Sequence, residues 1–330
     1  MSVPSLGRPA RRVGTGLLTL LLVTWVVFLL CHLVPGDAVS VDLGEESIGH
    51  RLPPERVAEL RALYHLDQPV VRQYGMWLRD LARGDLGRSF HDGRPVSEKL
   101  GARLGLTVTL NALSLALMIV LAVPLGAAAA LKPGSRADRW TGAATYALYA
   151  VPVFWAGLLL QILFSVRLEW LPLFGLESPD ARALGVLPRI ADRGAHLVLP
   201  VLCLSYGGIA YLSRFVRANL TESLHGDAVR AARARGLSPG RLLFGHAFRQ
   251  ASVPMLTLAG FLLPGLVGGS VIVETVFALP GLGRMFVDAV FQRDVPVIMG
   301  LTLLSGTATL IGIVAADLLY SVFDPRVRRG

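Results

Sequence analysis

The few residues that could form an enzymatic site lack the neighbours that catalysis requires. A phosphate-binding loop for ATP needs Gly-Lys followed by Ser or Thr, yet the only two lysines, Lys99 and Lys132, precede leucine and proline. No H-E-x-x-H metalloprotease motif is present, and Ser305-Gly306 lacks the preceding glycine of a G-x-S-G serine site. We therefore predict no catalytic residues and no ATP hydrolysis by this chain.

Four further residues have side chains that could bind ions. Cys31 and Cys203 each lie in an apolar run without a second cysteine or a histidine pair, so we predict neither a metal site nor a disulfide. Glu274 and Asp317 lie in apolar segments, where an ionisable residue can couple transport to protons or cations. Both are close to a predicted segment end, and we interpret them as structural groups satisfied by water or a neighbouring arginine.

A short helix is predicted at the start of the basic stretch from Asp227 to Pro254, with Asp227 as its cap. A small, flat face on this helix is formed by three alanines, Ala228, Ala231 and Ala232, while Arg230 and Arg233 point elsewhere. Such a face would let the groove of another protein approach closely, although an ordinary surface helix can have the same pattern.

A second helix is predicted directly after the first. Gly236 suits the left-handed residue that ends a helix. Ser238 followed by Pro239 is a helix cap with proline at the first helical position, and this helix would end before Pro254. The stretch is therefore a helix, a glycine turn and a helix.

The composition indicates a membrane protein. Of 330 residues, 53% are hydrophobic and 17% charged, and the mean hydropathy is +0.56. The net charge of +9 could suggest nucleic-acid binding, but the basic residues are interleaved with long apolar runs, so we predict no nucleic acid as partner.

Six apolar stretches are long enough to cross a membrane, which takes about 20 residues. They are approximately Val13 to Pro35, Gly105 to Leu131, Thr141 to Val166, Ala195 to Ser213, Ser252 to Leu279, and Val295 to Val322. The first resembles a signal peptide, but it exceeds the usual core of about 7 to 15 residues and lacks a cleavage site. We predict an all-α, polytopic bundle of six transmembrane helices surrounded by membrane lipid.

The basic residues also predict the orientation of the chain. The N-terminus, residues 132–140, residues 214–250 and the C-terminal tail together carry 16 basic and 4 acidic residues. The segments on the opposite side carry 16 basic and 17 acidic residues. Because basic loops stay in the cytoplasm, we predict that both termini are cytoplasmic.

Two other segments have patterns of interest. The pattern of residues 36–104 predicts an outer helical segment, with one helix at Glu55–Tyr64 after Pro53-Pro54 and another after Pro69. This segment either packs on the bundle or contacts a delivered solute or its carrier.

The fifth apolar stretch contains proline and small residues that favour a bend. These residues could line a translocation path or simply allow close packing: Pro264, Gly265, Gly268, Gly269 and Ser270.

Ordered motifs along almost the whole chain resemble the permeases of binding-protein-dependent ATP-binding cassette (ABC) importers, in the dipeptide, oligopeptide and nickel family. Arg230-Ala231-Ala232 with Gly236 is similar to the E-A-A-x-x-x-G core of the EAA-type coupling loop, with arginine in place of glutamate. Similar motifs are Leu33-Val34-Pro35-Gly36-Asp37, Leu66-Asp67-Gln68-Pro69, Arg83-Gly84-Asp85-Leu86-Gly87 with Ser89, Val273-Glu274-Thr275-Val276-Phe277, Pro280-Gly281-Leu282-Gly283, Ala316-Asp317-Leu318-Leu319-Tyr320 and Asp324-Pro325-Arg326-Val327-Arg328.

The resemblance implies the type I importer permease (MetI-like) fold and the first, B-type permease of a prokaryotic cytoplasmic membrane. Residues 1–104 would hold the first span and the extracytoplasmic segment, residues 105–322 a five-helix core with the coupling loop at 219–252, and residues 323–330 a cytoplasmic tail. Implied partners are a second homologous permease, two ATPases that bind ATP and Mg²⁺, and an extracytoplasmic solute-binding protein; this chain would hold no cofactor. An ion-coupled secondary transporter is the alternative, and which solute is carried stays open.

Overall fold

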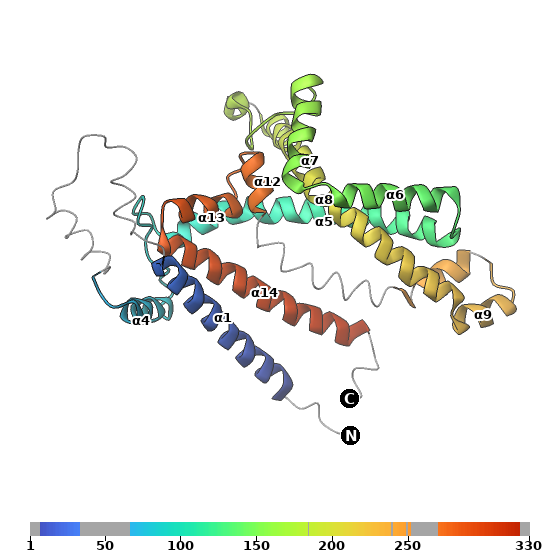
Figure 1. Cartoon of the computed structure of the whole chain (residues 1–330), viewed down its shortest axis with the longest axis horizontal. Coiled ribbons are helices and arrows are strands. Elements are labelled where there is room, and N and C mark those ends of the chain that lie inside the picture. Colours follow the sequence, from blue (N-terminus) through green and yellow to red (C-terminus); the bar gives the residue numbers. More distant parts are fainter. Residues whose placement is uncertain are drawn as a thin grey trace. The chain divides into compact units, whose positions relative to one another are not determined.

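The computed structural model describes residues 7–33, 67–183, 185–238, 240–248, 250–251 and 270–323, which are predominantly helical (Figure 1). Within these ranges the β-type pairing consists of an isolated antiparallel bridge between Arg88 and Pro95. The chain divides into two compact units: unit 1 is Met1–Gly105 with Gly281–Leu310, and unit 2 is Leu106–Pro280 with Ile311–Gly330.

Unit 1 is built around a hydrophobic core to which several helices contribute. It contains α1 (Gly7–Leu33), α4 (Val70–Leu81), the start of α5 (Val96–Leu131), α13 (Leu282–Phe291) and most of α14 (Val295–Phe323). The buried core residues come from α5, α13 and α14: Val96, Leu100, Leu282, Met285, Ala289, Val297, Ile298 and Leu301. At Gly300 a side chain would meet Val96, since an added Cβ would lie 2.6 Å from Val96 Cγ1, so α5 and α14 approach closely.

Helix α4 packs against α1 through aromatic and polar contacts. The Tyr74 hydroxyl lies 3.0 Å from Thr24 Oγ1 and donates to the Leu21 carbonyl at 3.1 Å. The Tyr74 ring also meets Trp25 edge to face, with the ring centroids 4.9 Å apart. The helix predicted after Pro69 is therefore confirmed, whereas the one predicted at Glu55–Tyr64 lies outside the described residues.

Unit 2 has α8 (Val186–His225) as its longest helix. Around it are the rest of α5, α6 (Arg136–Ala150), α7 (Val153–Leu160), the π-helical η1 (Gln161–Arg167), the 3₁₀ turn η2 (Pro179–Ala183), α9 (Asp227–Ala234), the π-helical η3 (Arg241–Ala247) and α12 (Val271–Val276). Helices α5 and α8 nearly touch at Gly126, where an added Cβ would lie 2.4 Å from the Ser213 carbonyl oxygen. Only glycine fits this contact, because a backbone atom cannot move aside as a flexible side chain can.

The third predicted span contains a sharp bend that was not predicted from the sequence. Helix α6 ends at Ala150 and α7 begins at Val153, with a bend of 100° between the two segments. Proline supplies no N–H and forces the preceding residue out of the helical region; accordingly, Val151 before Pro152 is extended, with φ −78° and ψ 124°. The bend therefore follows from a single proline in an otherwise apolar helix.

Four described helices are long and apolar enough to cross a membrane, or five if the bent pair forms one span. The four are Gly14–Leu33, Val96–Leu131, Val186–His225 and Val295–Ala315. Helices α5 and α8 start before the predicted apolar stretches, and α8 also continues beyond its stretch. Most of the fifth predicted stretch, residues 252–269, lies outside the described residues, so the count of six remains a prediction.

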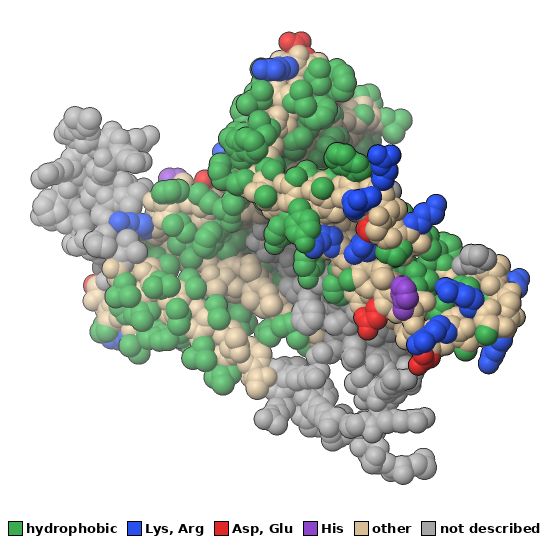
Figure 2. All heavy atoms as spheres, turned by 45° about the vertical axis from the view of Figure 1, so that its right-hand side comes forward, with side chains coloured by type: hydrophobic (Ala, Val, Ile, Leu, Met, Phe, Trp, Pro, Cys, Tyr) green, Lys and Arg blue, Asp and Glu red, His purple; other side chains and the backbone are tan. Residues whose placement is uncertain are grey.

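Hydrophobic side chains cover much of the face of the molecule that Figure 2 shows. On α7 and η1 of unit 2, large apolar residues are widely exposed, including Phe154 (51%), Trp155 (49%) and Ile162 (48%). Helices with such a surface need an apolar environment, because a water-soluble monomer rarely exposes large contiguous apolar patches.

Candidate functional site

The first candidate segment is α9, which follows α8 after the single residue Gly226. Its inner side enters a hydrophobic cluster formed with the ends of α5 and α8 and with η3: Ala130, Leu220, Val229, Ala232, Leu242, Leu243, Ala247 and Ala251. Val229 is fully buried and Ala232 is 5% exposed. An eight-residue helix is too short to be stable alone, so this packing holds it in place.

The end of α9 has the geometry of a Schellman motif. Gly236 has φ +79°, as predicted from the sequence, and its N–H donates to the Arg233 carbonyl at 3.0 Å. The Leu237 N–H donates to the Ala232 carbonyl at 3.4 Å, and Leu237 also packs against the cluster that contains Ala232. These two bonds with an apolar contact define the motif, which fixes the direction in which the chain leaves α9.

The start of α9 differs from the prediction that Asp227 caps it. Gly226 is the N-cap, no side-chain cap bond forms, and Asp227 is the first helical residue. Its carboxylate instead pairs with Arg230 at 2.7 Å on the protein surface. The reason is that α8 ends at His225, which leaves Gly226 as the only residue available to turn the chain. A negative charge in the first turn still favours the helix.

The predicted alanine face is also only partly present. Ala228 and Ala231 are exposed, but Ala232 points into the hydrophobic cluster. The small exposed face therefore comprises Ala228 and Ala231, whereas Ala232 allows α9 to approach η3 and α8. Arg230 and Arg233 are exposed, as predicted.

The second predicted helix begins after Ser238, whose carbonyl accepts a hydrogen bond from the Leu242 N–H at 3.0 Å. Pro239 lies outside the described residues. From Arg241 to Ala247 the winding is π-helical, with i→i+5 bonds, so Ala247 returns above Leu242 in the cluster. The two helices around Gly236 thus share one core.

The exposed side of this segment is basic. Residues 226–247 contain four arginines and one aspartate, a net charge of +3. Arg230, Arg233, Arg235 and Arg241 are all exposed. Figure 2 shows Lys and Arg side chains gathered at the end of unit 2 where α9 and the connection from α5 to α6 lie. An acidic or neutral partner surface would suit this end better than a basic one.

The second set of candidates, the residues proposed for a translocation path, is mostly outside the described residues. This applies to Pro264, Gly265, Gly268 and Gly269. Ser270 is the N-cap of α12, and its carbonyl accepts a hydrogen bond from the Glu274 N–H at 2.9 Å.

Glu274 lies in a different environment from the one expected. It is fully buried, and the Thr107 hydroxyl donates to its carboxylate at 3.0 Å. This bond links α12 to α5 and was not predicted from the sequence, whereas the expected water or arginine partner stays a prediction. The side chain of Asp317, in α14, lies outside the described residues.

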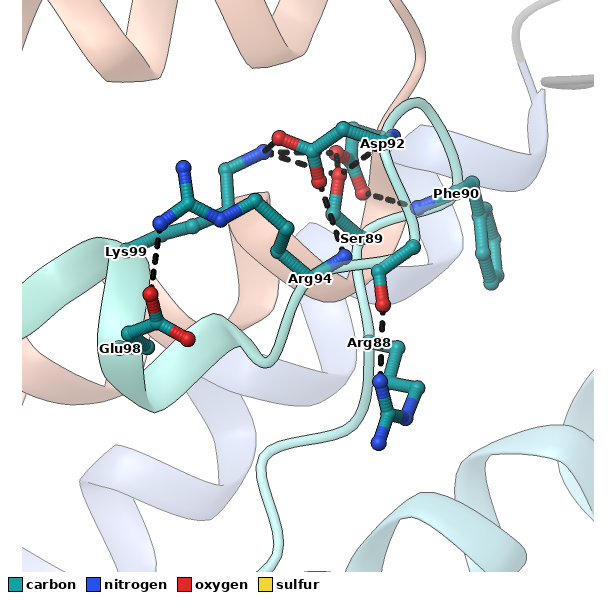
Figure 3. Close-up of polar contacts among 9 residues, drawn as sticks. Arg88, Ser89, Phe90, Asp92, Arg94, Glu98 and Lys99 are labelled. Carbon is teal, nitrogen blue, oxygen red and sulfur yellow. Dashed lines mark hydrogen bonds and ion pairs between the residues drawn. The ribbon is translucent and has the colours of Figure 1, made fainter.

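Unit 1 contains a buried polar cluster that sequence reasoning missed (Figure 3). Asp294 is 1% exposed; it accepts hydrogen bonds from the Ser89 hydroxyl and, at 3.0 Å, from the Phe90 N–H. Lys99 Nζ lies 2.9 Å from Ser89 Oγ, 2.8 Å from Asp92 and 3.9 Å from Asp294. Ser89 is part of a motif noted in the sequence, but no local pattern links it to Asp294, 205 residues away.

The loop that carries Ser89 and Asp92 is held in a defined shape. Gly84 and Gly87 have φ of +80° and +81°, which explains the glycines of the Arg83-Gly84-Asp85-Leu86-Gly87 motif. Partial burial favours the neutral form of Asp92, but hydrogen bonds from Lys99 and the Arg94 N–H prevail and lower its pKa to about 2. Asp92 is therefore ionised at neutral pH, and its charge offsets that of Lys99.

Known proteins resemble this chain over almost its full length. Residues 122–329 match the family described as binding-protein-dependent transport system inner membrane component, and residues 9–111 match the N-terminal domain of such membrane components. The chain belongs to this family. With several long apolar helices, it is a multi-pass inner-membrane component of a transport system.

Individual relatives carry more specific names. The chain is 37% identical over 318 residues to the oligopeptide transport system permease protein AppB of Bacillus subtilis (strain 168), covering 96% of this chain and 98% of the relative. It is 40% identical over 324 residues to a putative peptide transport system permease protein of Brucella abortus (strain 2308), covering 96% and 98%. It is 34% identical over 334 residues to the dipeptide transport system permease protein DppB of Escherichia coli (strain K12), covering 96% and 97%.

Proposed function

We propose that this chain is the permease subunit of an ATP-driven importer that moves peptides, or related small solutes, across the cytoplasmic membrane. The relatives are named as oligopeptide, dipeptide and peptide permeases and align from end to end with this chain. The sequence lacks a phosphate-binding loop. In this proposal the energy comes from partner subunits, namely two ATPases that bind ATP and Mg²⁺.

The complete importer would also contain a second homologous permease and an extracytoplasmic solute-binding protein. In this arrangement residues 1–104 form the first span and the outer segment, residues 105–322 form the transport core, and residues 323–330 form the tail. The whole chain has six spans. The charge asymmetry of the loops supports cytoplasmic termini and a cytoplasmic position for α9. The stretch from Pro264 to Ser270 is our candidate for the translocation path.

The observation that carries the coupling mechanism is the two-sided construction of α9. Its inner side is fixed by Val229 and Ala232, while Ala228 and Ala231 present a small surface to the outside. A partner helix groove can approach such a surface closely. Because only Gly226 separates α9 from α8, a displacement of α9 by closing ATPases would be passed to α8 with little loss in a flexible linker.

Charged substitutions on the exposed face test this proposal. Ala228→Glu and Ala231→Glu should leave the permease in the membrane at normal abundance, because both side chains are at the surface. They should lower the amount of ATPase that co-purifies by more than about tenfold, since an unpaired charge would be buried in the interface. Solute uptake, normalised to permease abundance, should fall in parallel.

Gly240→Glu is the matched control. Gly240 is exposed, has helical backbone angles of φ −65° and ψ −42°, and has open space around an added Cβ. The Gly240→Glu variant adds the same charge outside α9. Its losses of ATPase recovery and of uptake should therefore be much smaller. Normal ATPase recovery and normal uptake in both alanine variants would exclude α9 as the coupling surface.

A further inference from the structure

Helices α6 and α8 of unit 2 enclose a cavity that the coupling mechanism does not use. Its volume is about 640 Å³, and its walls are mainly apolar side chains of α6, α8 and the end of α5. A neighbouring cavity of about 440 Å³ shares Tyr146 and Arg214 and adds Tyr149 and Tyr211. A drug-sized or lipid-chain-sized molecule fits into spaces of this volume.

Three arginines line the larger cavity, and one of them is already paired. Arg217 binds Asp138 through two bonds, at 2.6 and 2.7 Å. The Arg214 guanidinium lies over the Tyr146 ring, 3.6 Å from its centroid, and donates to the Tyr146 hydroxyl. Within the described part of the chain, neither Arg214 nor Arg139 forms a salt bridge with a carboxylate. Two positive charges at an apolar cavity are thus available to an anion.

Arg214 directly follows the fourth predicted apolar stretch, Ala195 to Ser213, at the position along α8 where a lipid headgroup would lie. The residue lies 11 positions before the end of α8, which is about 16 Å along the helix axis. Three tyrosines at the same level, Tyr146, Tyr149 and Tyr211, and Trp140 in the first turns of α6 are exposed. Exposed tyrosine and tryptophan are typical of the boundary between hydrocarbon and water.

We infer that the cavity between α6 and α8 binds an anionic phospholipid of the cytoplasmic leaflet. Arg139 and Arg214 hold its phosphate, and an acyl chain occupies the apolar cavity. Basic pockets between transmembrane helices on the cytoplasmic side are suited to anionic headgroups. A free phosphate would leave the apolar walls without a function. The inference rests on the membrane orientation in the proposed function, which places α9 and Arg139 in or near the cytoplasm.

Native mass spectrometry of the purified complex, released from nanodiscs that contain equal amounts of phosphatidylglycerol and phosphatidylcholine, tests the inference. The wild type should retain phosphatidylglycerol preferentially. The double variant Arg139→Gln/Arg214→Gln should lose about 25-fold in this preference, at about fivefold for each arginine. Arg241→Gln removes an exposed arginine that does not line the cavity and should leave the lipid preference unchanged.

A second variant tests the acyl-chain part of the site. Gly142 lines the cavity, and a Cβ added there meets no atom within 4 Å. Gly142→Leu should place an apolar side chain in the cavity and lower phosphatidylglycerol retention while both arginines remain. Inorganic phosphate should not compete with the lipid.

Several results would overturn the inference. The first is equal retention of both lipids by the wild type. The second is unchanged phosphatidylglycerol retention in the double variant and in Gly142→Leu. The third is displacement of the lipid by inorganic phosphate. Efficient cross-linking of Gly142→Cys to the second permease would show that a protein helix fills the cavity. ATP-driven uptake by the reconstituted wild type is measured in parallel; if it persists while lipid preference is absent, the lipid site is wrong and the importer assignment stands.

Discussion

Gly236 and Ala232 are close in sequence but constrain the coupling segment in different ways. Gly236 has open space around it and is required for its backbone conformation, whereas Ala232 is required for its small volume inside the cluster. Ala232→Glu would bury a charge and disturb the fold of the segment. It therefore cannot separate docking from folding, although the sequence alone placed Ala232 on the docking face.

A substitution at Gly236 isolates the backbone requirement. Gly236→Val should cost about 1–2 kcal/mol, because a β-branched residue is strained at φ +79°, and it should reorient α9 relative to η3. We expect reduced co-purification of ATPase and reduced uptake at normal membrane abundance. Gly236→Asn is the control, since asparagine tolerates this conformation better. Equal uptake by the wild type and Gly236→Val would show that transport does not depend on the left-handed conformation at this turn.

Asp294 is the residue on which the polar cluster of unit 1 depends. Asp294→Ala should lower the free energy of unfolding by about 1–3 kcal/mol, because it removes the buried carboxylate that accepts hydrogen bonds from the Ser89 hydroxyl and the Phe90 N–H. Thermal or denaturant unfolding of the purified permease measures this loss. Glu98→Ala removes a surface pair with Arg94 and should have no measurable effect. Similar stability of the two variants would contradict a structural role for Asp294.

At the scale of elements, the bend between α6 and α7 is supported by α8. The Tyr206 hydroxyl donates to the Val151 carbonyl at 2.5 Å, and Cys203 Sγ lies 3.4 Å from the Val153 carbonyl. Within a membrane, a carbonyl freed by a helix break needs such a partner, because no water is present to supply one. The proline breaks the helix, and α8 supplies hydrogen-bond donors to the carbonyls at the break.

Removing the supporting hydroxyl tests this account. Tyr206→Phe should destabilise the permease by about 1–3 kcal/mol, since the carbonyl of the half-buried Val151 would lose its donor. Tyr149→Phe, at a side chain that is 67% exposed, is the matched control and should be near neutral. Unfolding of both variants in the same detergent provides the comparison. If Tyr206→Phe is as stable as the control, the bend does not depend on this bond.

At the scale of the whole molecule, the membrane orientation rests on the uneven distribution of charge. The side that carries the coupling segment has 16 basic and 4 acidic residues, against 16 and 17 on the other. Single cysteines at Ala82 and Ser238, both exposed, in a chain with Cys31 and Cys203 replaced by alanine, should react with an impermeant reagent from opposite sides. In intact cells we expect Ala82→Cys to be labelled and Ser238→Cys to be protected. Labelling of both would contradict the proposed topology.

The sequence by itself determined the features that depend on neighbouring residues: the apolar helices, helix α4, and the left-handed Gly236 at the end of α9. These follow from local periodicity and backbone preference, which need no knowledge of distant contacts. Tertiary packing decided that Ala232 faces inward, that Gly226 rather than Asp227 caps α9, and that Asp294 pairs with Ser89. Such features depend on which surfaces meet in space, and contacts between residues about 200 positions apart have no local signature.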